Sequence, residues 1–192
     1  MLRDANPQLF KTAGYSLARQ FLEGVQFLHH NLVAHLDLKP NNIVVGAHTQ
    51  LHIIDFGVAV RVSELDSQIT GYQGTKGYVA PEVEQNPDAP YQPIRADLWS
   101  TGEVLRFLAR RLTTHCYEID NLAGRLQDPN PQQRPLLSMI RLDTLFKVPS
   151  QDQANRPFKL KRKLGGDAHG REEIKRICVP TCPSMDYLPL AF

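Results

Sequence analysis

The sequence predicts a mainly α fold of the α+β class, a helical bundle with a small β-hairpin at one cleft. Apolar residues recur at helical spacing over 12–30 and again over 95–112. Two short apolar runs, 43–45 and 51–54, are separated by a turn at 46–50, and this pattern indicates a hairpin. We therefore expect the helices to form the core and the hairpin to lie at its edge.

The expected elements follow one another along the chain. Residues 1–11 are polar and contain proline, which indicates an N-terminal extension. In the helix at 12–30, one face carries the apolar residues Leu17, Phe21, Val25 and Leu28. The remaining expected elements are a strand at 33–34, a helical turn at 82–85, and helices at 95–112, 117–126 and 136–146.

Length, charge and cysteine content exclude several classes of protein. A chain of 192 residues is one ordinary domain, and 22 basic against 20 acidic residues give a net charge of only +2. Nucleic-acid binding is therefore not expected. Three cysteines do not make a disulfide framework, so we expect an intracellular protein, cytoplasmic or nuclear. No apolar run approaches the roughly 18 residues that span a membrane.

A group of polar residues between the first helix and the end of the hairpin could form a catalytic site. Asp37, Lys39 and Asn42 lie within one short loop, and the second strand delivers Asp55 directly before Phe56. The hairpin would place both carboxylates and the amide beside one cleft. This set suits phosphoryl transfer, in which one acid takes the proton of an attacking hydroxyl while the other acid and the amide hold Mg²⁺ against phosphates.

Five stretches, in order, carry a family resemblance. Residues 35–42 resemble the catalytic loop H-R-D-L-x-x-x-N of protein kinases, and Asp55-Phe56-Gly57 resembles their D-F-G motif. Residues 74–82 resemble the end of an activation segment with A-P-E intact, while 97–100 and 134–135 resemble later landmarks. The resemblance covers 12–147 and is to the C-terminal lobe of a eukaryotic-type serine/threonine protein kinase. Residues 148–192, with a basic run at 159–163, read as a mostly disordered polar tail.

The resemblance implies a role for each residue of the polar loop and hairpin. Asp37 would be the catalytic base, and Lys39 would neutralise charge on the transferred phosphoryl group. Asn42 and Asp55 would bind Mg²⁺ and thereby ATP. Val44 would form the floor beneath the adenine, with a purely structural strand position as the alternative.

The resemblance also implies substrate-binding or structural roles for residues outside the polar loop and the hairpin. Thr75 in the activation segment agrees with the serine/threonine class. Glu82 and Arg134 would form a buried ion pair, and Asp97 would be structural. Leu36 occupies the place where many kinases have an arginine that grips a phosphorylated activation segment, so we expect no such switch here.

The N-terminal lobe of a kinase is not recognisable upstream of the polar loop. Only 36 residues precede Asp37, and they contain no G-x-G-x-x-G and no V-A-I-K. We therefore expect a half-built nucleotide site and an exposed apolar upper face that a partner covers. Besides a kinase acting on a protein substrate, two interpretations stay open: a pseudokinase or interaction module, and a small-molecule phosphotransferase. The latter usually lacks D-F-G together with A-P-E.

Overall fold

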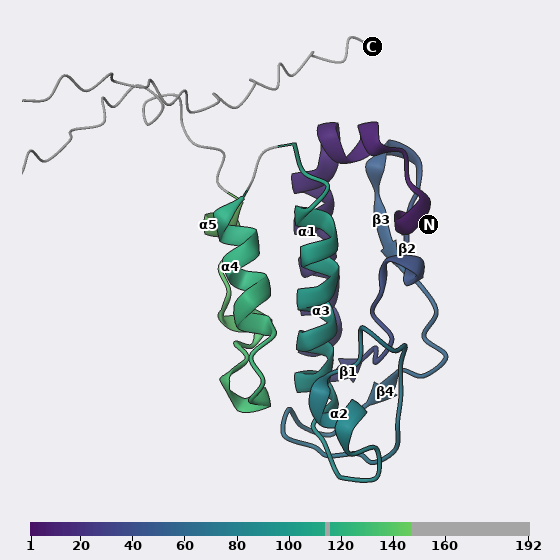
Figure 1. Ribbon diagram of the computed structural model, residues 1–192, viewed down its shortest axis with the longest axis vertical. Helices are drawn as coiled ribbons and strands as arrows, with labels where there is room; N and C mark the ends of the chain where they lie inside the picture. The colour runs from purple at the N-terminus through teal and green to yellow at the C-terminus, as the bar shows by residue number, and fades with distance from the viewer. Residues whose placement is uncertain (114–115, 147–192) are drawn as a thin grey trace, which may run out of the picture. The chain divides into compact units, whose positions relative to one another are not determined.

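The structure, a computed structural model, describes residues 1–113 and 116–146, which lie within one unit, Met1–Lys147. The tail predicted for 148–192 lies outside the described residues. Helices dominate the unit, and the two short β-ribbons lie beside them (Figure 1). The principal elements are α1 (Pro7–His30), β1 (Val33–Ala34), β2 (Ile43–Val45), β3 (Leu51–Ile53), β4 (Val60–Arg61), α2 (Pro81–Gln85), α3 (Pro93–Ala109), α4 (Tyr117–Leu126) and α5 (Leu142–Leu145).

The N-terminal residues, for which the sequence predicts an extension at 1–11, are part of the packed unit and contain the start of the first helix. Helix α1 begins at Pro7, because the Asn6 side chain caps it by accepting a hydrogen bond from Gln8 N at 2.9 Å. A 3₁₀ turn, η1 (Leu2–Asp4), precedes it. Leu2 is fully buried and Phe10 nearly so. Leu2 and Phe10 anchor this stretch to the core, although most of its other residues are polar.

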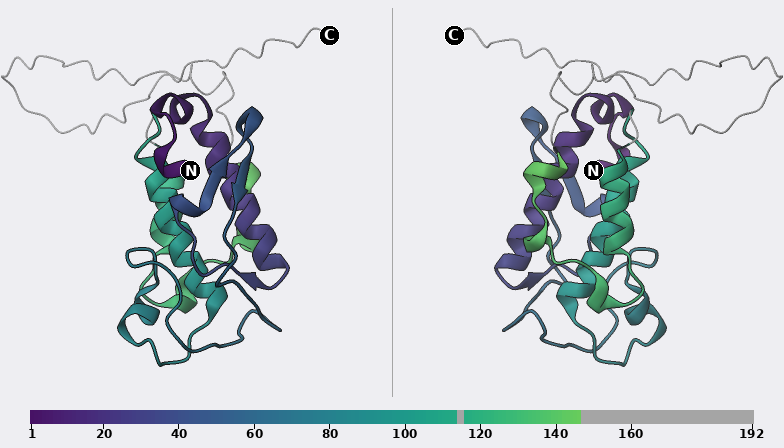
Figure 2. Two further views of the ribbon diagram at one scale, coloured as in Figure 1. Left: turned by 90° about the vertical axis from the view of Figure 1, so that its right-hand side faces the viewer. Right: turned by 90° about the vertical axis from the view of Figure 1, so that its left-hand side faces the viewer.

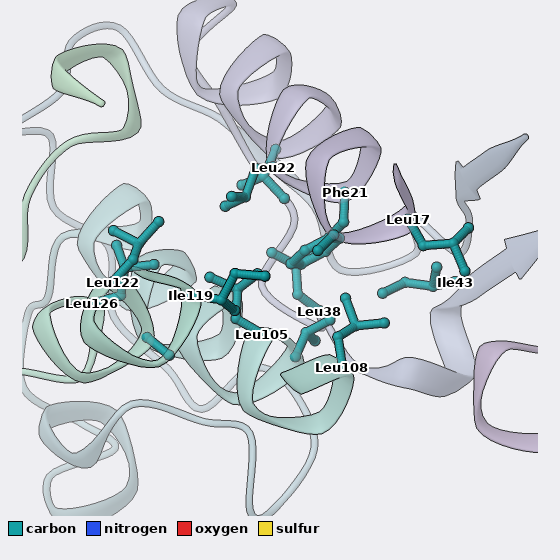
Figure 3. Close-up of a cluster of buried hydrophobic side chains, with 14 of the residues drawn as sticks. Leu17, Phe21, Leu22, Leu38, Ile43, Leu105, Leu108, Ile119, Leu122 and Leu126 are labelled. Atoms are coloured by element: carbon teal, nitrogen blue, oxygen red, sulfur yellow. The ribbon is translucent and has the colours of Figure 1, made fainter. Parts of the chain in front are cut away.

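The main core lies between α1, α3 and α4, and it also holds the polar loop in place. Figure 3 shows the side chains that meet there, from α1 (Leu17, Phe21, Leu22), α3 (Leu105, Leu108) and α4 (Ile119, Leu122, Leu126), together with Leu38 and Ile43. Leu38 belongs to the loop that carries Asp37, and Ile43 begins β2. Both are fully buried, so the loop is fixed at its centre and at its exit by apolar packing.

The predicted hairpin is present. Strands β2 and β3 pair antiparallel, with Ile43 opposite Ile53 and Val45 opposite Leu51. These four residues pack towards the main core, whereas the side chain of Val44, between them in sequence, points to the other face of the hairpin. A second pairing, of β1 with β4, joins two strands of two residues each and was not predicted.

The C-terminal part of the unit differs from expectation. The single helix predicted over 136–146 is wrong, because two short turns occupy that stretch, the 3₁₀ turn η5 (Leu137–Met139) and α5. Leu137 and Leu142 are both buried, and five positions on one continuous helix would point them about 140° apart. A break lets both reach the core. Helix α3 also ends at Ala109, before the predicted Leu112. None of the described helices combines the length and apolarity needed to cross a bilayer.

Candidate active site

The loop between β1 and β2 alternates between buried and accessible side chains. Leu36 and Leu38 are buried, at 6% and 0% exposed, while Asp37 and Lys39 are only partly buried. Leu36 has a φ of 63°, in the left-handed region that non-glycine residues rarely adopt. Leu38 thus holds the loop on the main core and Leu36 holds it on a second hydrophobic cluster, while Asp37 and Lys39, which alternate with them, face the accessible side.

The Asp37 carboxylate is the centre of a hydrogen-bond network. Lys39 Nζ donates to Asp37 Oδ2 at 2.7 Å and to Thr75 Oγ1 at 2.7 Å. Thr75 Oγ1 in turn donates to Asp37 Oδ1 at 2.7 Å. Asn42 Nδ2 donates to Asp37 Oδ2 at 3.0 Å and to the Asp37 carbonyl at 2.9 Å. The fold therefore brings together four of the residues that the sequence singled out, one of them 38 positions from Asp37.

This network also sets the charge of Asp37. Burial alone raises the pKa of the carboxyl group, but the hydrogen bonds from Lys39, Thr75 and Asn42 and the charge of Lys39 outweigh it, so the pKa is lowered from its usual 3.8. Asp37 is therefore a carboxylate at neutral pH, with its charge held in a fixed orientation.

Asp97, in the N-terminal part of α3, fixes the backbone of the loop between β1 and β2. Its side chain is fully buried, and its two oxygens accept hydrogen bonds from His35 N at 2.6 Å and Leu36 N at 2.7 Å. His29 Nε2 lies 3.2 Å from Asp97 Oδ2. Those two backbone bonds stabilise the left-handed turn at Leu36. The sequence analysis missed His29, although its position four residues after Val25 places it on the buried face of α1.

His35 connects the loop to the strand that precedes Asp55. Asp37 N donates to His35 Nδ1 at 3.3 Å, so His35 Nε2 carries the proton and donates to Ile54 O at 3.0 Å. Ile54 N donates to Asn42 O at 2.9 Å. The His35 ring also packs beside the Phe56 ring, with the two ring centroids 4.8 Å apart, so His35 serves both in packing and as a hydrogen-bonding bridge.

Asp55 lies at the end of this bridge with an exposed side chain and a φ of 65°. Among the described residues, no group of three or more His, Cys, Asp or Glu is arranged to hold a metal ion. Asn42 and Asp55 are still a donor set that fits Mg²⁺, because this ion prefers oxygen and takes only one or two carboxylates alongside phosphates and water. Asn42 uses its amide nitrogen on Asp37, which leaves its amide oxygen for such a role.

The predicted ion pair between Glu82 and Arg134 is present and bidentate. Arg134 Nη1 and Nη2 donate to Glu82 Oε1 and Oε2, each at 2.7 Å. The Arg134 side chain is fully buried, and it also donates to the carbonyls of Asp128 at 2.9 Å and Arg95 at 2.8 Å. Its guanidinium carbon lies 5.3 Å from the Trp99 ring centroid. The pair ties the A-P-E stretch at α2 to the stretch after α4.

Comparison with known proteins agrees with this arrangement. The family described as protein kinase domain matches residues 5–158. CBL-interacting protein kinase 8 of Oryza sativa subsp. japonica is 32% identical over 152 residues, 67% of this chain and 34% of that protein. CBL-interacting serine/threonine-protein kinase 8 of Arabidopsis thaliana is 30% identical over 164 residues, 73% of this chain and 36% of that protein.

A third relative has higher identity over a shorter stretch. It is the probable serine/threonine-protein kinase KKQ8 of Candida glabrata, 44% identical over 90 residues, 45% of this chain and 12% of that protein. The chain thus spans between 12% and 36% of the length of these three curated relatives. Because the family match extends over most of the chain and coincides with the Asp37 network and the Glu82–Arg134 pair, this chain belongs to the protein kinase family.

Proposed function

We propose that this chain carries the phosphoryl-transfer site of a serine/threonine protein kinase, which moves the γ-phosphoryl group of ATP to a Ser or Thr hydroxyl of a protein. Protein kinases as a family use ATP with a divalent metal and act on proteins. The observation that carries the proposal is the network joining Asp37, Lys39, Thr75 and Asn42. The names of the serine/threonine kinase relatives support the same substrate class.

The hydrogen-bond inventory of Asp37 leaves room for a substrate hydroxyl. Oδ2 already accepts from Lys39 and Asn42, whereas Oδ1 accepts only from Thr75 among the described residues. A carboxylate oxygen has two lone pairs, so Oδ1 retains one acceptor site. With its lowered pKa, Asp37 orients the hydroxyl and accepts its proton as the new oxygen–phosphorus bond forms and the bond between the γ-phosphorus and the bridging oxygen breaks to release ADP. The Lys39 ammonium stabilises the negative charge of the transferred group.

We assign Asn42 and Asp55 to Mg²⁺, which when bound neutralises charge on the phosphates of ATP. Val44 is half-buried and its side chain lies on the face of the hairpin away from the main core, which supports a role as the floor beneath the adenine. Beside Asp55, Ile54 and Phe56 remain 36% and 46% exposed. We propose that a partner covers this apolar edge, and that the protein works inside the cell, where ATP is available.

The test uses the 192-residue chain with Mg²⁺, radiolabelled ATP and a mixed protein substrate. Asp37→Asn should lower phosphoryl transfer by about 10²–10⁴-fold, the usual contribution of a positioned base. Asp88→Asn is the matched control, because Asp88 is an exposed acid in a loop away from the site. Asn42→Ala and Asp55→Asn should abolish thermal stabilisation by ATP with Mg²⁺.

The outcomes separate the competing functions. Transfer that is equal in wild type and Asp37→Asn would contradict the kinase proposal. Failure to bind nucleotide and to transfer phosphate would favour an interaction module that retains only the scaffold. Transfer to a sugar or to choline, with none to protein, would favour a small-molecule phosphotransferase.

A further inference from the structure

An open cavity of about 450 Å³ adjoins the Asp37 network. Its size is that of a pocket that takes a small ligand or one or two side chains. The lining includes residues from the N-terminal turn, the loop, the segment before α2 and the end of α3: Arg3, Lys39, Thr75, Tyr78, Phe107 and Arg111. Lys39 and Thr75 belong to both the cavity and the network, so a substrate whose hydroxyl reaches Asp37 has its neighbouring residues at this cavity.

The cavity is positively charged. Three of its lining residues are cations, and none of the described residues that line it is an Asp or a Glu, although Asp37 adjoins it through Lys39 and Thr75. The charge of Lys39 is shared with Asp37, to which it donates at 2.7 Å. Arg3 and Arg111 therefore determine the charge that a ligand in the cavity meets, and neither forms an ion pair within the described part of the chain.

Arg3 is held at the cavity by the packing of its neighbours. Leu2 is fully buried in the main core. The turn η1 packs against β2 and against the 3₁₀ turn η2 (Pro40–Asn42), which continues the loop from Lys39. Figure 2 shows the N-terminus beside this part of the unit. Arg3 itself is exposed, so its guanidinium group is available to a ligand.

Arg111 is held in a defined orientation. Its guanidinium carbon lies 3.5 Å from the ring centroid of Phe107 and 5.7 Å from that of Phe10. Nη1 donates to the Phe107 carbonyl at 3.1 Å, which occupies one of the five N–H donors of an arginine. Stacking and this hydrogen bond restrict the side chain, so less conformational entropy is lost when it binds an anion.

We propose that this cavity selects protein substrates that carry an anionic side chain, a carboxylate or a phosphorylated residue, within about three residues of the acceptor hydroxyl. An extended chain advances about 3.3–3.6 Å per residue, and Lys39 and Thr75 belong to both the network and the cavity lining, so the close neighbours of the acceptor residue lie beside the cavity. Arginine donors match the planar carboxylate and the phosphate group. The proposal rests on the proposed function, because it names the substrate class of the same site.

The test measures binding, so it does not depend on turnover. Fluorescence anisotropy follows labelled peptides that contain one serine and differ only at flanking positions, occupied by Glu, phosphoserine, Ala or Lys. We expect the Glu and phosphoserine peptides to bind the 192-residue chain about tenfold more tightly than the Ala peptide, since each exposed ion pair contributes up to about fivefold. The Lys peptide should bind more weakly still, and salt should reduce all of these differences.

Variants identify the cations responsible. Arg3→Glu and Arg111→Glu should each remove most of the preference for anionic peptides. Lys11→Glu and Arg110→Glu are matched controls with the same charge change at exposed positions outside the cavity lining, and both should retain it. Arg111 also packs on Phe107, so circular dichroism of each variant checks its fold, and Arg3→Glu alone suffices for the test.

The results distinguish this inference from the kinase proposal. Equal affinity for the four peptides, or a preference that survives in Arg3→Glu, would overturn the inference even if phosphoryl transfer depends on Asp37. A preference that Arg3→Glu removes supports the inference, whether or not transfer is detected. Comparison of the Glu and phosphoserine peptides then shows which anion the cavity takes.

Discussion

Replacement of Arg134 by alanine should strongly destabilise the unit. The substitution removes a fully buried cation and leaves the Glu82 carboxylate, only 21% exposed, without its partner. It also removes the donors to the carbonyls of Asp128 and Arg95. Each stranded buried acceptor costs about 1–3 kcal/mol, and the loss of one partner of a buried pair costs about 3–5 kcal/mol in total. We expect a loss of that size for Arg134→Ala.

Urea denaturation followed by circular dichroism measures the effect. With a slope of about 2 kcal/mol per molar urea, a loss of about 3–5 kcal/mol lowers the midpoint by about 2 M. Arg125→Ala is the control, since Arg125 is an exposed arginine near the end of α4, and its loss should be about 1 kcal/mol or less.

A double-mutant cycle separates the ion pair from the rest of the effect. Once Arg134 is absent, Glu82→Ala removes a stranded carboxylate and should cost much less than it does in the wild-type background. The coupling free energy should be about 1.5–3 kcal/mol. If Arg134→Ala unfolds at the same urea concentration as Arg125→Ala, or if the two single losses simply add, the reasoning about the buried pair is refuted.

Two further predictions follow from the segment before α2 and from the charge of Asp37. Gly74 has a φ of 107°, and a Cβ there would lie 2.5 Å from Leu36 O, so Gly74→Ala should lose about 2–4 kcal/mol of stability in the same urea assay. Gly71 has a φ of 96° but open space within 4 Å of the place a Cβ would take, so Gly71→Ala should lose only about 1–2 kcal/mol, and equal losses would contradict the close approach. The pKa of Asp37 is lowered in the folded protein, so its carboxylate stabilises the fold above pH 3.8 and loses this contribution as pH falls through the lowered value. In Thr75→Ala one hydrogen bond to the carboxylate is lost, and NMR titration should show the pKa of Asp37 moving up towards 3.8; an unchanged pKa would show that Thr75 does not contribute to the shift.

The parts of the site that lie close together in sequence were predictable. Asp37, Lys39 and Asn42 fall within one short loop, and the hairpin that carries Asp55 follows from two apolar runs and a turn. Thr75 and the Glu82–Arg134 pair were inferred only through the family resemblance. Local patterns contain no information about which distant residues meet, and 52 positions separate the two members of that pair.

The missed features depend on contacts between distant segments. His29 reaches Asp97 across 68 positions, and its partner is set by the packing of α1 on α3. Residues 1–11 are polar and therefore indicate an extension, but burial of Leu2 and the packing of η1 against η2 and β2 place Arg3 beside the loop. The break within 136–146 arises in the same way, since the need to bury Leu137 and Leu142 together overrides local helix propensity.

Leu36 helps to hold the segment before α2 in place. Many kinases have an arginine there that binds a phosphate on the activation segment, whereas Leu36 is 6% exposed and packs in a second hydrophobic cluster with Val79 and Ala80. Leu36 O also lies against Gly74, and Ser100 Oγ donates to Tyr78 O at 2.7 Å. Apolar burial and backbone contacts therefore hold Thr75 within reach of Asp37 and Lys39.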